Sequence, residues 1–154
     1  MKPRLETWKV APGVLKTMTE LQNHDNNCGL EHSLQELVKT RASQINGCAF
    51  CLHMHTRDAR AAGETEERLY LLSAWRESPL YTERERAALA WTEALTLISQ
   101  TGAPDDVYQA LRASFTEEEM VELTLLINTI NAWNRFAVGF RTVHPMKPKH
   151  VAAA

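Results

Sequence analysis

Apolar residues recur every three or four positions along most of the chain, a pattern typical of amphipathic helices that bury one face. Their stripes, with the polar and glycine-containing segments between them, predict about six or seven helices. These helices lie near residues 14–21, 30–45, 48–62, 69–77, 82–101, 104–111 and 116–140. Polar and apolar residues nowhere alternate strictly over more than a few positions, so the expected fold is an all-α bundle.

Local signals mark several helix ends. Asn46 and Gly47 form a stop after the second stripe, and Thr82 and Thr116 each begin a Thr-x-x-Glu capping box. The helix that follows Thr116 is apolar almost all round. A helix without a polar face is buried on several sides, which predicts a place at the centre of the bundle, an oligomer interface, or both.

Length, composition and charge narrow the class of protein. The 154 residues are 44% hydrophobic and 23% charged, as expected of one globular domain spanning residues 1–154, with a flexible tail from about residue 145. The net charge of -2 gives no basic excess for nucleic acid. No apolar run reaches the length of a membrane span, and the first residues lack the apolar core of a signal peptide. The expected location is the cytoplasm.

The stretch from Cys48 to His55 carries the candidate chemistry. It contains a Cys-x-x-Cys pair, Cys48 and Cys51, with His55 four residues after the second cysteine. On a helix with about 100° per residue, Cys51 lies about 60° and His55 about 20° from Cys48, so all three share one face. His53 points elsewhere. The spacing also allows a hydrogen bond between Cys51 and His55.

The position of this pair at the start of a helix favours a reactive thiol. The preceding stop places Cys48 and Cys51 in the first turn, where free N–H groups and the helix dipole stabilise an anion. A Cys-x-x-Cys pair at such a position has a lowered thiol pKa. We interpret the pair as a dithiol that cycles to a disulfide, with His55 as the base or proton carrier.

Other interpretations of the cysteines stay open at this point. The pair could be inert core, or Cys28 could join Cys48, Cys51 and His55 as zinc ligands, although a second Cys-x-x-Cys or His-x-x-x-His is missing. Covalent haem is excluded because residue 52 is leucine. No glycine-rich phosphate loop or serine nucleophile motif occurs, and neither a cofactor nor a metal is expected.

Polar residues outside the motif are harder to interpret. Glu36 lies about 150° from the centre of its helix's apolar stripe, which predicts a solvent-facing side chain. Ser33 and Glu36 also match a capping box, which would give Glu36 a structural role. Asn128, Asn131 and Asn134 recur every third residue in the most apolar helix, and we expect them to be interhelical hydrogen-bonding groups or residues that line the site.

Three parts of the chain together resemble a known family. The first joins residues 42–51 (ASQINGCAFC) with 54–60 (MHTRDAR), the second is 83–91 (ERERAALAW), and the third is 131–135 (NAWNR). They resemble the AhpD-like alkylhydroperoxidases of the carboxymuconolactone decarboxylase superfamily. The resemblance covers about residues 30–141.

The resemblance implies an all-α homo-oligomer, a trimer or a hexamer, that acts as a thiol peroxidase or disulfide reductase. In that family a glutamate, two cysteines and a histidine form a proton relay. These roles fall on Glu36, on Cys51 as the residue that attacks peroxide, on Cys48 as the resolving residue and on His55. Phe50 replaces a histidine found just before the second cysteine of the founding peroxidase, so one relay member is missing.

The preferred function is therefore a thiol-dependent peroxidase that reduces small-molecule hydroperoxides and is reset by a thiol or dithiol reductant. Two alternatives remain. One is a decarboxylase or lactone-processing enzyme, in which the cysteines are secondary. The other is a non-catalytic redox sensor or zinc-stabilised oligomer. Neither nucleic acid nor membrane is an expected partner.

Overall fold

The computed structural model describes residues 2–145, and every regular element in that range is a helix. The predicted flexible tail from about residue 145 falls almost entirely outside the described residues. The helices are α1 (Thr7–Val10), α2 (Pro12–Asp25), α3 (His32–Ile45), α4 (Ala49–Ala61), α5 (Glu66–Leu71), the 3-10 helix η1 (Leu72–Glu77), α6 (Glu83–Thr96), α7 (Ile98–Thr101), α8 (Asp105–Ser114) and α9 (Glu117–Phe140). The all-α bundle expected from the sequence is confirmed.

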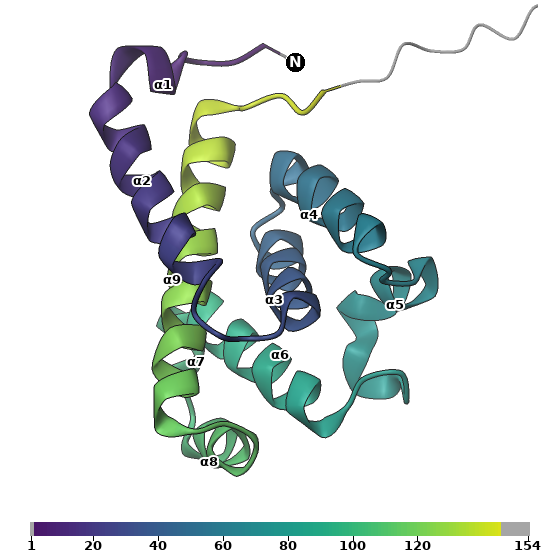
Figure 1. Cartoon of the computed structure of the whole chain (residues 1–154). Helices are drawn as coiled ribbons and strands as arrows, with labels where there is room; N and C mark the ends of the chain where they lie inside the picture. The colour runs from purple at the N-terminus through teal and green to yellow at the C-terminus, as the bar shows by residue number, and fades with distance from the viewer. Residues whose placement is uncertain (1, 146–154) are drawn as a thin grey trace, which may run out of the picture.

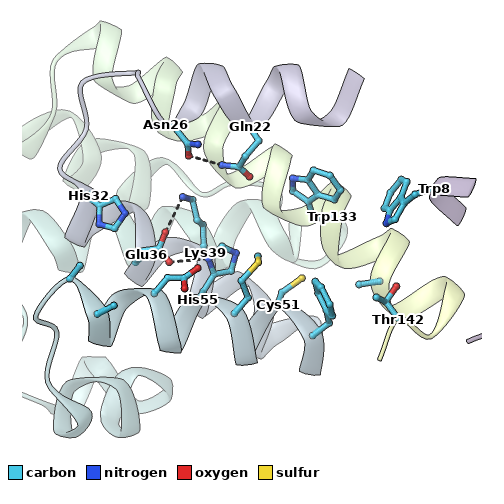
Figure 2. Close-up of a pocket in the computed structure, with 16 residues that line it drawn as sticks. Trp8, Gln22, Asn26, His32, Glu36, Lys39, Cys51, His55, Trp133 and Thr142 are labelled. Atoms are coloured by element: carbon cyan, nitrogen blue, oxygen red, sulfur yellow. Dashed lines mark hydrogen bonds and ion pairs between the residues drawn. The ribbon is translucent and has the colours of Figure 1, made fainter. Parts of the chain in front are cut away.

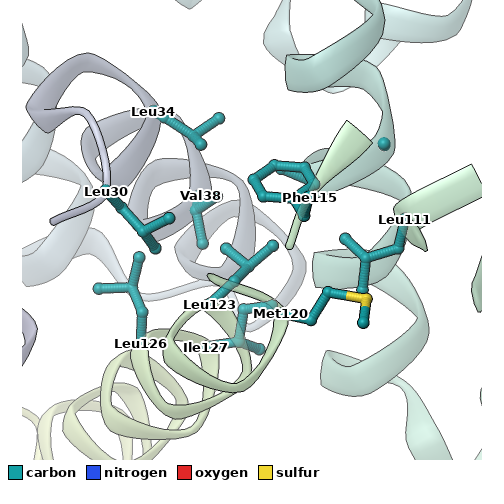
Figure 3. Packing of buried hydrophobic residues seen from close by; sticks show 11 residues of the cluster. Leu30, Leu34, Val38, Leu111, Phe115, Met120, Leu123, Leu126 and Ile127 are labelled. Carbon is teal, nitrogen blue, oxygen red and sulfur yellow. The ribbon is translucent and has the colours of Figure 1, made fainter. Parts of the chain in front are cut away.

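Helix α9 is the axis of the bundle (Figure 1). It packs against α2, α3, α4, α6 and α8, which explains why its sequence has no continuous polar face. Where α9 meets α3, α6 and α8, side chains form the largest apolar cluster (Figure 3). Its buried members are Leu30, Leu34, Val38, Ala87, Ala88, Leu111, Phe115, Met120, Leu123, Leu126 and Ile127.

A smaller cluster at the other end of α3 includes the two motif cysteines. Cys48 and Cys51 are buried there with Ala42, Ile130 and Ala137. Helices α3 and α4 are extensively packed against each other, and α9 contacts both. The thiols are therefore fixed between three helices rather than carried on a surface loop.

The helix ends show which boundaries the capping residues in the sequence could predict. Thr82 and Thr116 form complete capping boxes with Glu85 and Glu119, as predicted. The helix expected over 82–101 is instead interrupted at Leu97, whose backbone leaves the helical region and separates α6 from α7. Helix α1 was not predicted, because its four residues bury nothing and produce no apolar stripe.

Among residues 2–145, none of the helices combines the length and the apolar character needed to cross a lipid bilayer.

Candidate functional site

The loop between α3 and α4 places Cys48 at a helix start. Gly47 has a φ of 62°, in the left-handed region that glycine adopts without steric cost. Cys48 follows as the N-cap residue of α4, and its Sγ accepts a hydrogen bond of 3.4 Å from the backbone N–H of Cys51. The cap position, usually taken by a hydroxyl or carboxylate oxygen, is here filled by sulfur.

This arrangement gives the two thiols different acidities. Hydrogen bonding from the Cys51 side chain lowers the pKa of Cys48 to about 7; burial opposes this effect, and the backbone N–H of Cys51 adds to it. The hydrogen bond to Cys48 and burial raise the pKa of Cys51. The pair therefore loses its first proton readily, mainly from Cys48, and holds the second tightly. All three cysteines are free thiols in the structure.

Glu36 and His55 form a buried pair beside the thiols. Glu36 Oε2 lies 2.9 Å from His55 Nδ1, and both side chains are nearly inaccessible to solvent. The solvent-facing position predicted for Glu36 from helical periodicity is wrong, because α4 packs against α3 and brings His55 onto the carboxylate. The capping box suggested for Ser33 is also wrong: α3 begins at His32, one residue before Ser33.

Lys39 completes this charged group. Its Nζ donates to Glu36 Oε1 at 3.1 Å and to Gln35 Oε1 at 3.4 Å, and only 4% of the residue is exposed. Burial tends to raise the pKa of Glu36, but His55 and Lys39 together outweigh it and hold this pKa below its usual value. An ionised Glu36 can only accept the Nδ1 proton of His55, so in the neutral form of the ring Nε2 carries the free lone pair.

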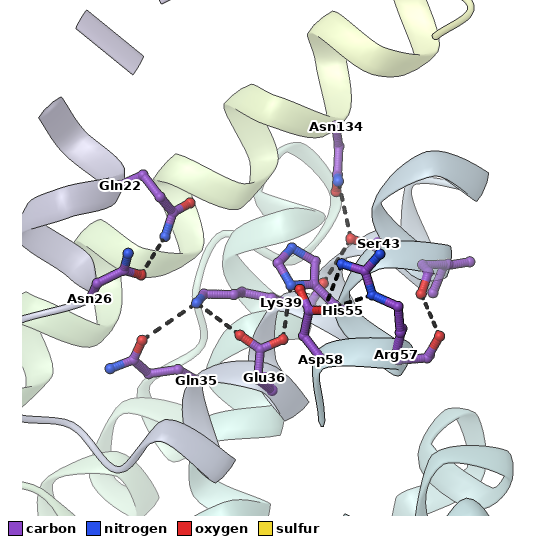
Figure 4. A network of polar contacts seen from close by, with 12 residues as sticks. Gln22, Asn26, Gln35, Glu36, Lys39, Ser43, His55, Arg57, Asp58 and Asn134 are labelled. Atoms are coloured by element: carbon purple, nitrogen blue, oxygen red, sulfur yellow. Dashed lines mark hydrogen bonds and ion pairs between the residues drawn. The ribbon is translucent and has the colours of Figure 1, made fainter. Parts of the chain in front are cut away.

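Asparagines of α9 brace the loop before Cys48, and Figure 4 shows the contact of Asn134 with Ser43. Asn46 Nδ2 donates to the Oδ1 atoms of Asn131 and Asn134, at 2.9 Å each, and Asn134 Nδ2 donates to Ser43 Oγ at 3.1 Å. Asn134 also interacts with both thiols and lowers their pKa values. The two roles considered for the α9 asparagines thus meet in Asn134, which joins helices and borders the site. For Asn128 the prediction is wrong, because its side chain is exposed.

A pocket of about 880 Å³ opens above Cys51, between α4 on one side and α1, α2 and α9 on the other (Figure 2). Glu36, Lys39, Cys51 and His55 contribute to its wall, whereas Cys48 does not line it. A molecule in the pocket can therefore reach the Cys51 sulfur directly. The volume suits an organic ligand of moderate size.

The predicted contact between Cys51 and His55 is not formed in this dithiol state. Within the described residues, no hydrogen bond joins His55 to either sulfur. The Cys51 thiol instead faces Cys48, while Glu36 holds the His55 ring. His55 and Cys51 still border the same pocket, so a bound molecule or water can bridge them.

Cys28 and His53 lie apart from the two motif thiols, whereas Phe50 borders the same pocket as Cys51. Cys28 packs against the large apolar cluster, and residues 2–145 contain no group of three or more side chains suited to hold a metal ion. Cys28 therefore does not complete a zinc site with the motif. His53 turns away and stacks on His144, whereas Phe50 lines the pocket.

Lys39 and Trp8 line the pocket, and neither is among the site residues predicted from the sequence. Lys39 could have been predicted from its spacing, because residues three apart on a helix are neighbours and can form an ion pair, as Glu36 and Lys39 do. Trp8 could not have been predicted in this way, because it comes from an N-terminal segment without helical periodicity. Its place in the pocket depends on the tertiary fold alone.

Comparison with known sequences identifies relatives of the chain. Residues 12–94 match the model of the Carboxymuconolactone decarboxylase family. The chain is 43% identical over 139 residues to the protein YdfG of Bacillus subtilis (strain 168), an alignment that covers 90% of this chain and 95% of YdfG.

Two solved structures show the extent of the structural similarity. ATU0492 from Agrobacterium tumefaciens, a protein of unknown function named as a candidate antioxidant defence protein AhpD, is 50% identical; its TM-score is 0.93, over 95% of this chain and 100% of that one. The debrominase Bmp8 is 18% identical with a TM-score of 0.82, over 90% of this chain and 75% of Bmp8. At that identity, Bmp8 shows a shared fold only.

Proposed function

Because the chain belongs to the carboxymuconolactone decarboxylase family and is AhpD-like within it, we propose that it is a thiol-dependent peroxidase. The observation that carries this proposal is the Cys48–Cys51 dithiol, with one acidic thiol at the helix start and the other at the floor of an organic-sized pocket. Glu36 and His55 supply the proton relay beside it.

In the first step, a water in the pocket carries one proton from the dithiol to His55, whose ring Glu36 orients. The proton that remains shifts along the hydrogen bond from Cys51 to Cys48, which leaves the thiolate on Cys51. The Cys51 thiolate attacks the terminal peroxide oxygen and breaks the O–O bond. The sulfur becomes a sulfenic acid, and the departing alkoxide takes the proton and leaves as an alcohol. Two electrons pass from sulfur to the peroxide in this step.

In the second step, the Cys48 thiolate attacks the Cys51 sulfur. A disulfide forms, and the displaced hydroxide takes up a proton and leaves as water. An external thiolate then attacks Cys51, the sulfur that borders the pocket. Cys48 departs as the leaving group, and the backbone N–H of Cys51 and the side chain of Asn134 stabilise its thiolate. A second reductant thiol, or the second thiol of a dithiol, completes the reset.

Thiol labelling and mass spectrometry test the proposal. One equivalent of cumene hydroperoxide should remove about two protons from the peptide that contains Cys48 and Cys51, while Cys28 stays free. Cys51→Ser should abolish peroxide consumption, and Cys28→Ser should retain it. Peroxide turnover by Cys51→Ser would show that the roles are wrong, and an unchanged wild-type mass would remove the proposal.

Reductive dehalogenation is a second candidate, favoured by the aromatic side chains that border the pocket with Cys51. The structure of a cysteine-to-alanine variant of Bmp8 in complex with 2,3,4-tribromopyrrole shows that protein with a brominated aromatic compound. With such a compound, the Cys51 thiolate would take bromine from carbon, which gains a proton. Cys48 would then release bromide and form the disulfide. Bromide release without peroxide turnover would favour this candidate.

The lactone-processing alternative does not need the dithiol. A Cys48→Ser/Cys51→Ser double variant that retains turnover of a carboxylactone would support it. The peroxidase proposal requires that this double variant be inactive with every peroxide tested. Assays of this double variant with a carboxylactone and with a peroxide therefore distinguish the lactone-processing function from the peroxidase function.

A further inference from the structure

The pocket above Cys51 has two chemically different ends (Figure 2). One end holds the charged and polar side chains of Glu36, Lys39 and His55. The other end is aromatic, with Trp8 and Trp133 facing the space beside Cys51, and Phe50 adds a third ring. A ligand that reaches the Cys51 sulfur therefore extends toward an aromatic wall.

Trp8 comes from a segment that contributes little else to the fold. Helix α1 has no buried residue, yet the ring of Trp8 lies 5.6 Å from that of Trp133 and 5.3 Å from that of Phe136, measured between centroids. The backbone N–H of Arg4 donates to Phe140 O at 2.9 Å and ties this segment to α9. The N-terminal segment thus supplies an aromatic wall whose Trp8 side chain is only partly covered.

The positive charge at the polar end of the pocket is already compensated. Lys39 is paired with the ionised Glu36 at 3.1 Å. A second carboxylate, Asp25, is fully buried close enough to interact with the same ammonium. An anionic ligand would therefore lose its hydration at this end without gaining a new ion pair with Lys39.

We propose that Trp8 is a specificity-determining residue, which makes the pocket favour bulky, uncharged organic hydroperoxides over hydrogen peroxide. This inference rests on the proposed peroxidase function. The hydrocarbon part of the substrate lies against Trp8 and Trp133, and its hydroperoxide group reaches Cys51. Apolar area removed from water at this wall supplies binding energy that hydrogen peroxide, which has no hydrocarbon part, does not gain.

Steady-state kinetics with three peroxides test the inference. Wild-type protein should have a kcat/KM for cumene hydroperoxide at least about tenfold above that for hydrogen peroxide, since a buried phenyl ring contributes that much or more. A carboxylated aryl hydroperoxide should be a poorer substrate than cumene hydroperoxide. Trp8→Ala should lower the ratio of kcat/KM values, cumene hydroperoxide over hydrogen peroxide, by about tenfold.

The matched control is Val10→Ala, which shortens an exposed side chain on the same short helix and outside the pocket. It should leave the ratio at the wild-type value, and Trp8→Phe should restore most of it. An unchanged ratio in Trp8→Ala, or an equal loss with both peroxides, would overturn the inference. So would dissociation of an oligomer by Trp8→Ala, since this wall would then be a subunit contact.

Calorimetry with cumyl alcohol separates this inference from the proposed function. The alcohol keeps the phenyl ring and lacks the peroxide bond. If the protein binds it in a Trp8-dependent way but consumes no peroxide, the apolar site stands and the peroxidase function fails. If wild-type protein consumes peroxides but shows no Trp8-dependent binding of the alcohol, the specificity inference fails and the function stands.

Discussion

At the scale of single residues, the thiol pair determines which proton is lost first. Cys48 has a pKa of about 7 because Cys51 donates a hydrogen bond to its sulfur. In a Cys28→Ser background, ultraviolet absorbance should therefore report one thiolate per chain that appears as the pH rises through about 7. The second thiolate should appear only at much higher pH.

The control for this titration is Cys51→Ala, which removes the side-chain donor. The remaining Cys48 should then ionise at a higher pH than in the parent protein, because only backbone groups and Asn134 still stabilise its thiolate. A midpoint that does not move would show that the helix start alone lowers the pKa, without help from Cys51.

Lys39 is expected to set the ionisation of Glu36. Lys39→Met keeps much of the volume but removes the cation, so the pKa of Glu36 should rise. The acid limb of the pH profile of kcat/KM should accordingly move to higher pH, since a protonated Glu36 no longer orients His55 in the active tautomer. Peroxide consumption measured across pH checks this.

Lys16→Met is the matched control, because Lys16 is exposed and pairs with Glu20 on α2, away from the thiols. Its acid limb should coincide with that of the wild type.

Glu36 also links the stability of the fold to pH. Its pKa is lower in the folded protein than its ordinary value of 4.5, so its contribution is present above that pH and is lost as the pH falls further. Lys39→Met should reduce this acid sensitivity; an unaltered profile would contradict the role given to Lys39.

At the scale of the helices, Gly47 links the end of α3 to the thiol at the start of α4. An alanine at residue 47 would have to adopt its φ of 62°, so Gly47→Ala should lower the free energy of unfolding by about 1 kcal/mol. The displaced cap should also raise the pKa of Cys48. Urea unfolding and thiol titration measure the two effects.

Gly13→Ala provides a contrasting control. Gly13 lies in α2, and an added Cβ there meets no atom within 4 Å. The substitution should leave the stability unchanged or raise it, by up to about 1 kcal/mol, because alanine has the higher helix propensity. If both alanine variants behaved alike, the conformation of Gly47 would not explain the result.

The observed helix boundaries agree with those predicted from the sequence where a side chain caps the helix, and differ at the breaks within the predicted helices, where no capping residue marks the end. The hydroxyls of Thr82 and Thr116 satisfy free N–H groups locally, so their boxes could be predicted. The break at Leu97 has no glycine or proline to signal it. The same applies to Ala74, whose non-helical backbone bends the segment that the sequence presented as one helix.

At the scale of the whole molecule, the candidate site depends on contacts between helices that periodicity does not encode. The Cys48–Cys51 pair could be placed from local spacing. The position of Glu36 could not be predicted in this way, because it lies on the polar face of α3, and that face is buried when α4 packs against it and His55 contacts Glu36. The family resemblance pointed to Glu36, and the trimer or hexamer that it implies stays a prediction.

Asp25 is a buried carboxylate at the end of α2. It is fully buried, and its carboxylate oxygens have no hydrogen-bond partner within residues 2–145. Burial raises its pKa, and the nearby Thr129 and Lys39 offset this only in part. The hydroxyl of Thr129 donates to Leu125 O at 3.0 Å, so it does not satisfy the carboxylate.

Asp25→Asn should therefore stabilise the folded protein at neutral pH, by roughly 1 kcal/mol or more, since it removes a buried carboxylate that accepts no hydrogen bond from the described residues and whose burial the more distant Lys39 offsets only in part. Because the folded pKa is raised, wild-type Asp25 takes up a proton as the pH falls, and the advantage of the variant should shrink toward about pH 4. Glu20→Gln, an exposed change on the same helix, should show no such trend. A variant less stable than the wild type at neutral pH would mean that the carboxylate of Asp25 is satisfied and contributes to folding as an anion.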